Sequence, residues 1–447
     1  MKKFLSLLMA LCLLSTMAAV PAMAEEPKEV LFWHAMSGNS AATMEAIVAD
    51  YNATQGAQNG YKVVPVFAGA YQESSVKLTA IISSGSNAEL PDLYQISARG
   101  CFEMKDNEYL IPIYKMLEKD PTGLDTANMS PASLQYASYQ GQLLGFPFAN
   151  SSVIMYYNKD QFKAAGLDPE AFPKTFAELA GAVDKLTIKQ GDKIDRFGFG
   201  VRMRFFLLGS LIPMQGEGLY AFDNMNGHNG TPTQITMTKD GSLSRFMDEW
   251  QKVLATGGVD PDNMSPNADF VGGMYSIIAA SSAGLASLLK QSQEAGFELG
   301  VAELCRVDEN STTGTGLGGS GLYMFDNGKG TSDGAWDFIK YFSTPEVSAK
   351  WMMGTGYYPV NRLAYDLPEV KALMESTPQW QILQTVAAHS ESYPDYLEPW
   401  VPGLNEMDTM VANELVSFAQ GQSKEDTIKN IDEQAATALQ DWYEQNQ

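Results

Sequence analysis

The spacing of hydrophobic residues along the chain changes repeatedly between the period of a strand and that of a helix. Apolar runs that predict strands lie at residues 29–35, 61–71 and 91–97. Helices with one apolar face are predicted at 39–54 and 73–85, because their apolar residues recur at helical intervals. This alternation predicts an α/β fold with a mainly parallel sheet and helices on both faces.

The second half of the chain continues the alternation and then becomes helical. Strands are predicted at 196–201 and 275–280. The last helix is predicted at 424–445, with Ser423 as its N-cap. The polar segment 215–233 is predicted to be a surface loop.

A buried strand and a stiff arm lie near the middle of the chain. The segment MYYNKDQFKAAGLDPEAFPKTF, residues 155–176, opens as an apolar, aromatic strand. It then forms one short amphipathic helix and leaves it at Gly166 into an arm that contains proline. The segment therefore lies between two stretches that each resemble a domain.

The first residues have the pattern of an export signal. Lys2 and Lys3 precede an apolar run at 4–20 and a small-residue cleavage site at 22–24. We expect residues 1–24 to be removed as a signal peptide, because the apolar run is too short for a membrane span. No later stretch of the sequence is long and apolar enough to be one.

The mature chain is strongly acidic. Loss of the two signal lysines takes the net charge from −23 to −25, and the length predicts two or three domains. An acidic surface repels nucleic-acid phosphates and anionic membrane surfaces, so neither is an expected partner. The two remaining cysteines, Cys101 and Cys305, are predicted to be separate buried thiols, with a single disulfide as the alternative.

The sequence contains none of the searched signatures of catalysis or metal binding. Its three histidines are not clustered with cysteines at metal-ligand spacing, and there is no nucleophile-elbow motif. The GTGLGG motif at 314–319 precedes a strand pattern, whereas a dinucleotide site needs a helix there. We therefore expect no catalytic residue, no metal and no cofactor. Paired carboxylates among Glu398, Glu406 and Asp408 keep a secreted carbohydrate-active enzyme as the alternative class.

A ligand-binding module fits the sequence better than an enzyme. Ligands of α/β sheets bind outside the carboxyl ends of the strands. Aromatic, hydroxyl and arginine side chains follow the predicted strands at such positions. They are Trp33, Tyr71, Arg99, Arg204 and the turn at 281–284.

One segment carries a specific resemblance. YYNKDQFKAAGLDPEAFPKTFAEL, residues 156–179, resembles the family 1 extracellular solute-binding proteins of ABC importers, most of all the glycerol-3-phosphate- and sugar-binding members. Further segments resemble this family in the same order, over essentially the whole mature chain. They are FWHAMSG, YKVVPVFAGAYQES, PFANSSVIMYYNKD, ASSAGLASLL, LGGSGLYMF and TGYYPVN.

The resemblance implies the type II periplasmic-binding-protein fold, with two α/β lobes, a ligand between them, and hinge strands like those of the maltodextrin binders. Residues 145–157 resemble the first hinge crossover. The chain is expected to cross back near 303–317 and again near 342–350. The implied lobes are 25–149 plus 305–342, and 150–304 plus 343–447.

The resemblance also implies ligand-contacting positions. Five match the glycerol-3-phosphate binders in residue type: Tyr71, Ser151, Ser281, Gly319 and Tyr357. Trp33, Ser37, Arg99, Arg204 and Trp400 complete the candidate set. Two positions differ, because the family's polyol-binding glutamate aligns with Ala98 and its phosphate-binding arginine aligns with Asp408. A carboxylate in place of that arginine disfavours a phosphate.

The sequence thus predicts an exported, monomeric, non-enzymatic receptor of an ABC importer, periplasmic or extracellular. It is expected to capture a carbohydrate or polyol between its lobes and to deliver it to membrane permease subunits. Glycerol 3-phosphate or a glycerophosphodiester is the alternative ligand, bound through Arg99 or Arg204.

Overall fold

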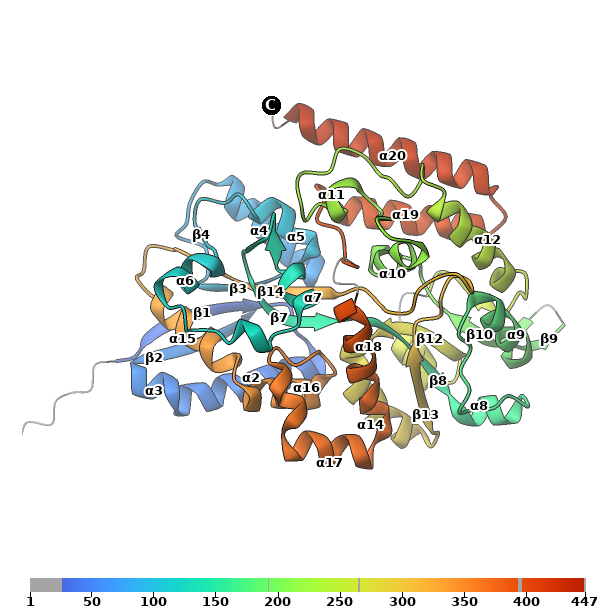
Figure 1. Ribbon diagram of the computed structural model, residues 1–447, viewed down its shortest axis with the longest axis horizontal. Coiled ribbons are helices and arrows are strands. Elements are labelled where there is room, and N and C mark those ends of the chain that lie inside the picture. Colours follow the sequence, from blue (N-terminus) through green and yellow to red (C-terminus); the bar gives the residue numbers. More distant parts are fainter. Residues whose placement is uncertain (1–25, 192, 264–265, 393–395, 446–447) are drawn as a thin grey trace, which may run out of the picture.

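The computed structural model describes residues 26–191, 193–263, 266–392 and 396–445. The protein contains two six-stranded sheets, each with helices packed against it, and the two sheets lie side by side in the molecule (Figure 1). The predicted α/β fold is therefore confirmed, whereas the predicted signal peptide lies outside the described residues. Within the described part of the chain, no helix combines the length and apolar character of a membrane span.

The first sheet has the strand order β2-β1-β3-β14-β4, and β7 also pairs with β14. β1 runs parallel to β2 and β3, while β14 runs antiparallel to β3, β4 and β7. The strands are β1 (Lys28–His34), β2 (Tyr61–Phe67), β3 (Leu93–Ser97), β4 (Leu110–Ile111), β7 (Phe146–Ser151) and β14 (Gly318–Phe325).

The helices of this first body come from the N-terminal third of the chain and from one later segment. They are α2 (Gly38–Ala53), α3 (Gln55–Asn59), α4 (Tyr71–Ser83), α5 (Ala98–Met104), α6 (Ile113–Lys119), η1 (Thr126–Asn128), α7 (Pro131–Tyr136) and α15 (Ser332–Phe342). A small hairpin of β5 (Ser138–Tyr139) and β6 (Gln142–Leu143) follows α7.

The second sheet has the order β11-β10-β12-β8-β13, with β9 paired to β10. Its strands are β8 (Val153–Asn158), β9 (Ile188–Gln190), β10 (Lys193–Gly200), β11 (Val259–Asp260), β12 (Tyr275–Ser281) and β13 (Leu299–Glu303). Its helices are α8 (Lys159–Ala164), α9 (Phe176–Leu186), α10 (Phe205–Leu211), η2 (Pro213–Gln215), α11 (Asp223–Asn226), α12 (Ser242–Leu254), α13 (Pro266–Val271), η3 (Ser282–Gly284) and α14 (Leu285–Ala295).

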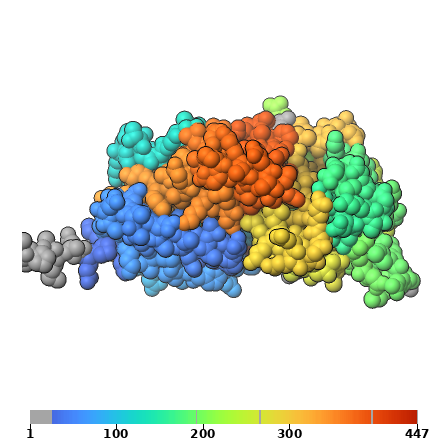
Figure 2. Space-filling model, turned by 90° about the horizontal axis from the view of Figure 1, so that it is seen from below, coloured from blue at the N-terminus to red at the C-terminus, as the bar shows by residue number. Residues whose placement is uncertain are grey.

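The remaining helices are C-terminal, and several of them lie between the two bodies. They are α16 (Pro345–Thr355), η4 (Arg362–Asp366), α17 (Pro368–Ser376), η5 (Pro378–Trp380), α18 (Gln381–Ser392), α19 (Leu404–Ala419) and α20 (Lys424–Gln445). Figure 2 shows the orange part of the chain, which includes α16 and α17, between the blue first body and the yellow and green second body. Asp426 N–H bonds to Ser423 at 3.0 Å, so the predicted cap of α20 is confirmed.

The two sheets are joined by one continuous buried segment. β7 ends at Ser151 and β8 begins at Val153, and every residue of both strands is buried. The predicted buried strand is therefore confirmed, and its apolar side chains are explained by contact with both cores. The chain returns to the first sheet between β13 and β14. The exact division into lobes stays a prediction.

Both sheets are mixed rather than mainly parallel. Each contains one interior strand that runs antiparallel to its neighbours, β14 in the first and β8 in the second. These are the strands by which the chain enters a sheet from the other one. The sequence pattern of a buried strand is the same for both directions, so the direction was not predictable from it.

Candidate functional site

The carboxyl ends of strands from both sheets converge on one carboxylate. Arg99 follows β3 of the first sheet and donates from Nη2 to Asp408 Oδ2 at 2.5 Å. Phe205, which follows β10 of the second sheet, donates its backbone N–H to Asp408 Oδ1 at 2.9 Å. Asp408 lies on α19 and is buried. Ligands of α/β sheets bind at such strand ends. The ends of β3 and β10 are therefore close enough for the single side chain of Asp408 to bond to residues that follow both strands.

A network of hydroxyl groups lines the first-sheet side. Tyr71, the first residue of α4, lies with its hydroxyl 3.2 Å from Ser320 Oγ and 3.0 Å from Gln95 Nε2, which donates to it. Its hydroxyl is also hydrogen-bonded to that of Tyr357. Burial raises the pKa of both tyrosines, so both remain protonated at neutral pH. Such groups both donate and accept, which suits solute hydroxyls.

Two carboxylates face the guanidinium of Arg99. Besides the bond to Asp408, Arg99 Nη1 lies 3.7 Å from Glu398 Oε1. The side chains of Glu398 and Asp408 are 6% and 5% exposed. Burial raises the pKa of Glu398 to about 7, while Arg99 and the Gly319 N–H act in the opposite direction. One cation thus pairs directly with Asp408 and lies farther from Glu398.

The second-sheet side contains a cavity of about 560 Å³. Arg204 and Ser281 line it together with Arg202, Phe206 and Asn267. The size is that of a small-molecule site, for which cavities of roughly 300 to 1,000 Å³ are usual. Ser281 Oγ accepts from Ala283 N–H at 3.2 Å, so this side chain caps the following turn. The predicted role of Ser281 toward a ligand stays a prediction.

Comparison with known proteins identifies the family. Residues 46–378 match the model of the bacterial extracellular solute-binding protein family, which is most of the chain. The chain belongs to this family. The sn-glycerol-3-phosphate-binding periplasmic proteins UgpB of Yersinia pseudotuberculosis and Escherichia coli are 28% and 27% identical to it, over 78% and 80% of both chains. Members of the family are non-enzymatic receptors, so the expectation of a receptor is confirmed.

Solved structures share the fold. UgpB of Mycobacterium tuberculosis in complex with glycerophosphocholine aligns with a TM-score of 0.74 at 20% identity, over 94% of this chain and all of that one. The cyclic alpha-maltosyl-1,6-maltose binding protein of Arthrobacter globiformis aligns with a TM-score of 0.71 at 21% identity, over 93% of this chain and all of that one. These likenesses confirm the fold that the resemblance implied.

In this solute-binding protein, six of the ten predicted contact residues lie in or beside the arrangement just described. They are Tyr71, Arg99, Gly319 and Tyr357, and the two cavity-lining residues Arg204 and Ser281. Gly319 has a φ of +110°, and a Cβ there would lie 2.2 Å from Ala149 O. The backbone therefore requires glycine at this position whether or not a ligand touches it.

The other predicted contact residues have structural surroundings. Ser151 is buried in the junction strand β7, and Ser37 is an exposed residue before α2. The Trp33 ring is covered by Lys77 Nζ at 3.7 Å and meets Tyr94 edge-on at 5.5 Å. Trp400 is fully buried, with its ring centroid 4.7 Å from that of His228. Their roles toward a ligand stay predictions.

The segment 215–233 is a surface loop only in part, because Glu217, Gly218 and Asn224 are exposed whereas other residues of it are buried. His228 is 1% exposed and Asn226 fully buried. His228 Nε2 lies 3.0 Å from Glu398 O, and Asn226 donates to Leu397 O at 2.9 Å. Burial lowers the pKa of His228 to about 4, so its ring is neutral at physiological pH. The polar composition of the segment suggested a loop. The sequence does not show that the amide and imidazole groups bond to backbone oxygens about 170 residues away.

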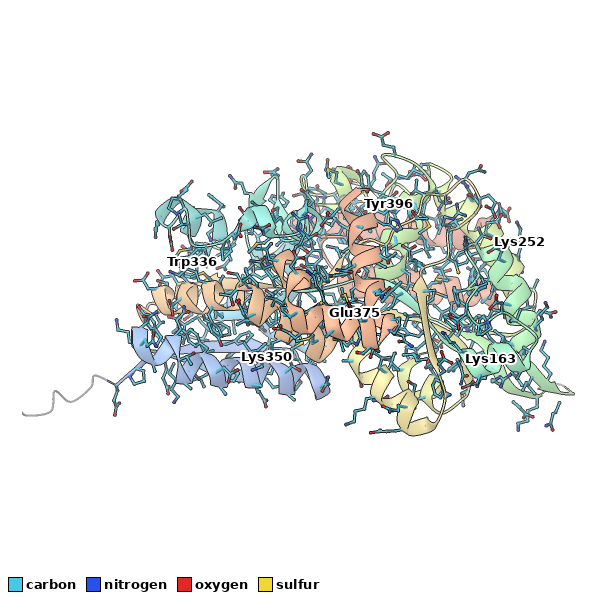
Figure 3. All side chains as sticks on the ribbon, turned by 60° about the horizontal axis from the view of Figure 1, so that its bottom comes forward. Lys163, Lys252, Trp336, Lys350, Glu375 and Tyr396 are labelled. Carbon is cyan, nitrogen blue, oxygen red and sulfur yellow. The ribbon has the colours of Figure 1, made fainter. Side chains whose placement is uncertain are left out.

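The chain segment that carries Glu398 lies between the two bodies. In Figure 3, Tyr396 is near the middle of the molecule, with Trp336 on one side and Lys163 and Lys252 on the other. Glu398 N–H donates to Leu317 O at 3.2 Å, next to the start of β14. From the sequence, Glu398 was recognisable only as a carboxylate of a possible enzyme. Its place in the EPWVPG loop contained no signal for a ligand site.

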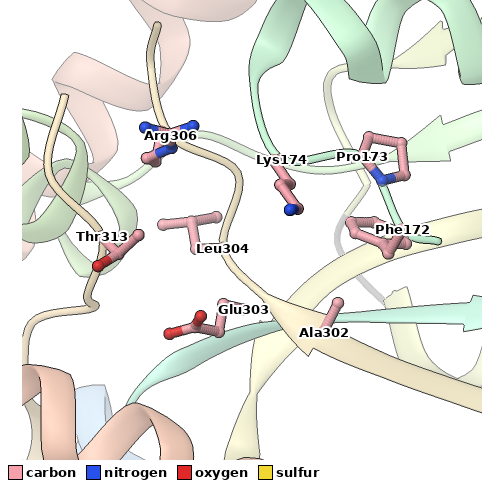
Figure 4. Close-up of a pocket in the computed structure, with 8 residues that line it drawn as sticks. All are labelled: Phe172, Pro173, Lys174, Ala302, Glu303, Leu304, Arg306 and Thr313. Carbon is pink, nitrogen blue, oxygen red and sulfur yellow. The ribbon is translucent and has the colours of Figure 1, made fainter. Parts of the chain in front are cut away.

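A separate hollow of about 460 Å³ lies away from these residues (Figure 4). The arm at Phe172–Lys174 and the segment after β13, with Glu303, Leu304 and Arg306, form it. Arg306 N–H donates to Lys174 O at 2.9 Å, which holds the two segments together. None of the predicted contact residues lines this hollow, so it is not part of the candidate site.

The remaining predictions concern histidine, cysteine and the glycine-rich motif. His34 is the last residue of β1, is buried, and accepts from Met36 N–H at 3.2 Å. Cys101 and Cys305 are separate buried thiols rather than a disulfide. β14 begins at Gly318, so the GTGLGG motif is a loop that enters a strand. Among the described residues, no cluster of three potential metal ligands occurs.

Proposed function

We infer that this extracellular solute-binding protein captures an uncharged, hydroxyl-rich solute, a carbohydrate or polyol, between its two bodies. The observation that carries this inference is the pairing of Arg99 with Asp408 at 2.5 Å, with Glu398 at 3.7 Å. A guanidinium held by two carboxylates has little attraction left for an anion, since a phosphate would have to displace them. The hydroxyls of Tyr71 and Tyr357 can each donate a hydrogen bond to a neutral solute or accept one from it.

The solute is then delivered to the permease subunits of an ABC importer. A solute that binds the closed form better than the open form shifts the protein toward closure, and the closed form is the one that docks. The protein acts as a monomer in this scheme. The family assignment supports the transport role, and the partner subunits are part of the proposal.

Glycerol 3-phosphate or a glycerophosphodiester is the second candidate. Arg202 and Arg204 both line the 560 Å³ cavity, which places two guanidinium groups on the second-sheet side. The UgpB relatives, which are named for glycerol 3-phosphate, give the same indication. A phosphate at this cavity would leave the Arg99 cluster to bind the hydroxyl end of the solute.

A thermal-shift panel on the purified mature chain distinguishes the two candidates. Ribitol, tagatose and mannotriose represent neutral solutes, and sn-glycerol 3-phosphate and glycerophosphocholine represent phosphorylated ones. A solute at one hundred times its Kd stabilises the protein by about 2.7 kcal/mol, which is a readily measured shift. We expect a shift with a neutral solute only. A shift with the phosphorylated solutes alone would overturn the proposal in favour of the second candidate.

A further inference from the structure

Glu398 lies close to Phe206, one of the residues that line the cavity together with Arg204 and Ser281. A Cβ on Gly318 would lie 2.9 Å from Glu398 Oε2 and 2.6 Å from the Phe206 ring, so carboxylate and ring meet over this glycine. Phe206 itself lines the cavity. The Glu398 carboxylate therefore lies beside an aromatic ring that lines the cavity.

The two carboxylates of the Arg99 cluster differ in their remaining capacity to accept hydrogen bonds. Both oxygens of Asp408 are used, one by Arg99 and one by the Phe205 N–H. Glu398 accepts from the Gly319 N–H, while its distance of 3.7 Å to Arg99 is too long for a hydrogen bond. A carboxylate offers about four lone-pair sites, so Glu398 has acceptor positions to offer a solute.

We propose that Glu398 is a specificity-determining residue whose ionised carboxylate accepts hydrogen bonds from solute hydroxyls. Asp408 positions Arg99, and Arg99 in turn keeps the Glu398 carboxylate partly ionised in a buried site. A phosphate would meet this carboxylate at close range and be repelled, whereas a polyol or sugar hydroxyl donates to it. The inference rests on the proposed function and identifies the residue that selects the solute class.

The groups around Glu398 predict how binding depends on pH. The titratable and charged groups that face it are Arg99 and Cys101 on α5, Asp408 on α19, Tyr71 on α4, Tyr136 on α7, and His228. Burial raises the pKa values of Cys101 and both tyrosines and lowers that of His228 to about 4. Titration of Glu398, with a pKa of about 7, therefore dominates this cluster between pH 6 and pH 8.

Solute affinity should then be higher above pH 7 than below it. If only the ionised form of Glu398 binds, the apparent Kd rises about tenfold between pH 8 and pH 6. Binding near pH 7 should release about half a proton, because the solute selects the ionised form. A neutral amide at this position would weaken binding at pH 8 and remove the dependence on pH.

The test compares wild type with Glu398→Gln and with Glu406→Gln, an exposed glutamate on α19. Ribitol, tagatose and mannotriose are titrated calorimetrically at pH 8 and pH 6. For whichever of them binds the wild type, Glu398→Gln should weaken binding about 10- to 100-fold at pH 8 and give equal Kd values at both pH values. Glu406→Gln should stay within about twofold of wild type, because exposed charges contribute little.

The outcomes separate this inference from the proposed function. If no neutral solute binds the wild type, the proposed function and this inference are both overturned. If one binds and Glu398→Gln keeps wild-type affinity or wild-type pH dependence, this inference alone is overturned. Should the variant not fold, proton release by the wild type, measured in two buffers of different ionisation enthalpy at pH 7, decides the matter. Release of about half a proton supports the inference, and no release overturns it.

Discussion

The regions around Arg99 and Arg204 show how differently two arginines at equivalent strand ends can be used. Arg99 follows a strand of the first sheet and is held by Asp408, with Glu398 close by. Arg204 follows a strand of the second sheet and lines a cavity of about 560 Å³. The first region is closed and its charge is balanced from within the protein. The region around Arg204 contains a cavity whose volume is in the range of small-molecule binding sites.

This difference shows that the charge that a residue presents to a ligand depends on its tertiary partners. Both arginines follow apolar strands, and sequence pattern assigned them the same candidate role. The acidic partners of Arg99 come from α19 and from the segment before it, about three hundred residues along the chain. Removing a buried carboxylate from a guanidinium is costly to stability, whereas a guanidinium that lines a cavity is also within reach of a solute.

The largest expected effect tests the closed region. Asp408→Ala removes the acceptor of both Arg99 and the Phe205 N–H, so it should lower the free energy of unfolding by about 3 to 5 kcal/mol. The matched control is Asp262→Ala, which breaks the pair with Arg202 at a side chain 53% exposed and should cost less than about 1 kcal/mol. Urea denaturation measures both. Equal losses would show that the two regions do not differ in this respect.

The next effect is a pH dependence of stability from the same region. The pKa of Glu398 is raised to about 7 in the native state, so the native protein binds a proton that the unfolded chain releases near its ordinary value. The free energy of unfolding should therefore fall by about 2 to 3 kcal/mol from pH 5 to pH 8. Glu103, with its pKa also raised to about 7 by burial, acts in the same direction.

Urea titrations of wild type and Glu398→Gln over this pH range isolate the contribution of Glu398. The variant should lose part of the decline and retain the part due to Glu103. Parallel curves for the two proteins would mean that Glu398 does not hold a proton in the native state.

A smaller effect tests the open region. Arg204→Gln should weaken binding of the captured neutral solute about tenfold, while it should lower the free energy of unfolding by less than Asp408→Ala does. Arg306→Gln, at the separate hollow, is the control and should leave affinity unchanged. Calorimetric titration and urea denaturation measure the two quantities. If Arg204→Gln changed stability more than affinity, the contrast between the two arginines would fail.

The smallest effect concerns Ser281 at the cavity wall. Ser281→Ala removes the cap on Ala283 N–H and should destabilise the protein by about 0.5 to 1 kcal/mol. Ser423→Ala removes the corresponding cap of α20 at Asp426 N–H and should cost a similar amount. Only the first variant should also weaken solute binding. If both variants bound the solute with equal affinity, Ser281 would act only as a cap and not as a ligand contact.

Much of the fold could be predicted from the order of apolar residues. The helices α2, α4 and α20 and the strands β1 and β3 lie within a few residues of their predicted ranges. The continuous junction of β7 and β8 was recognisable because residues 145–157 resemble the hinge crossover of the family, and both strands are buried throughout. The antiparallel direction of β14 could not be predicted from the sequence, because the direction of a strand depends on where the chain re-enters the sheet.

The candidate site was predictable only in part. Tyr71 and Arg99 could be named because strand-end loops meet at one edge of a sheet. Glu398 and His228 could not be assigned, because a lone glutamate or histidine in a polar segment has no periodic pattern to place it. Residue order alone determined the class of fold and the strand ends where a solute would bind, since local hydrophobic periodicity is written in the sequence. Tertiary structure decided the charge of that site, because Arg99, Asp408 and Glu398 come together only when distant segments fold against each other.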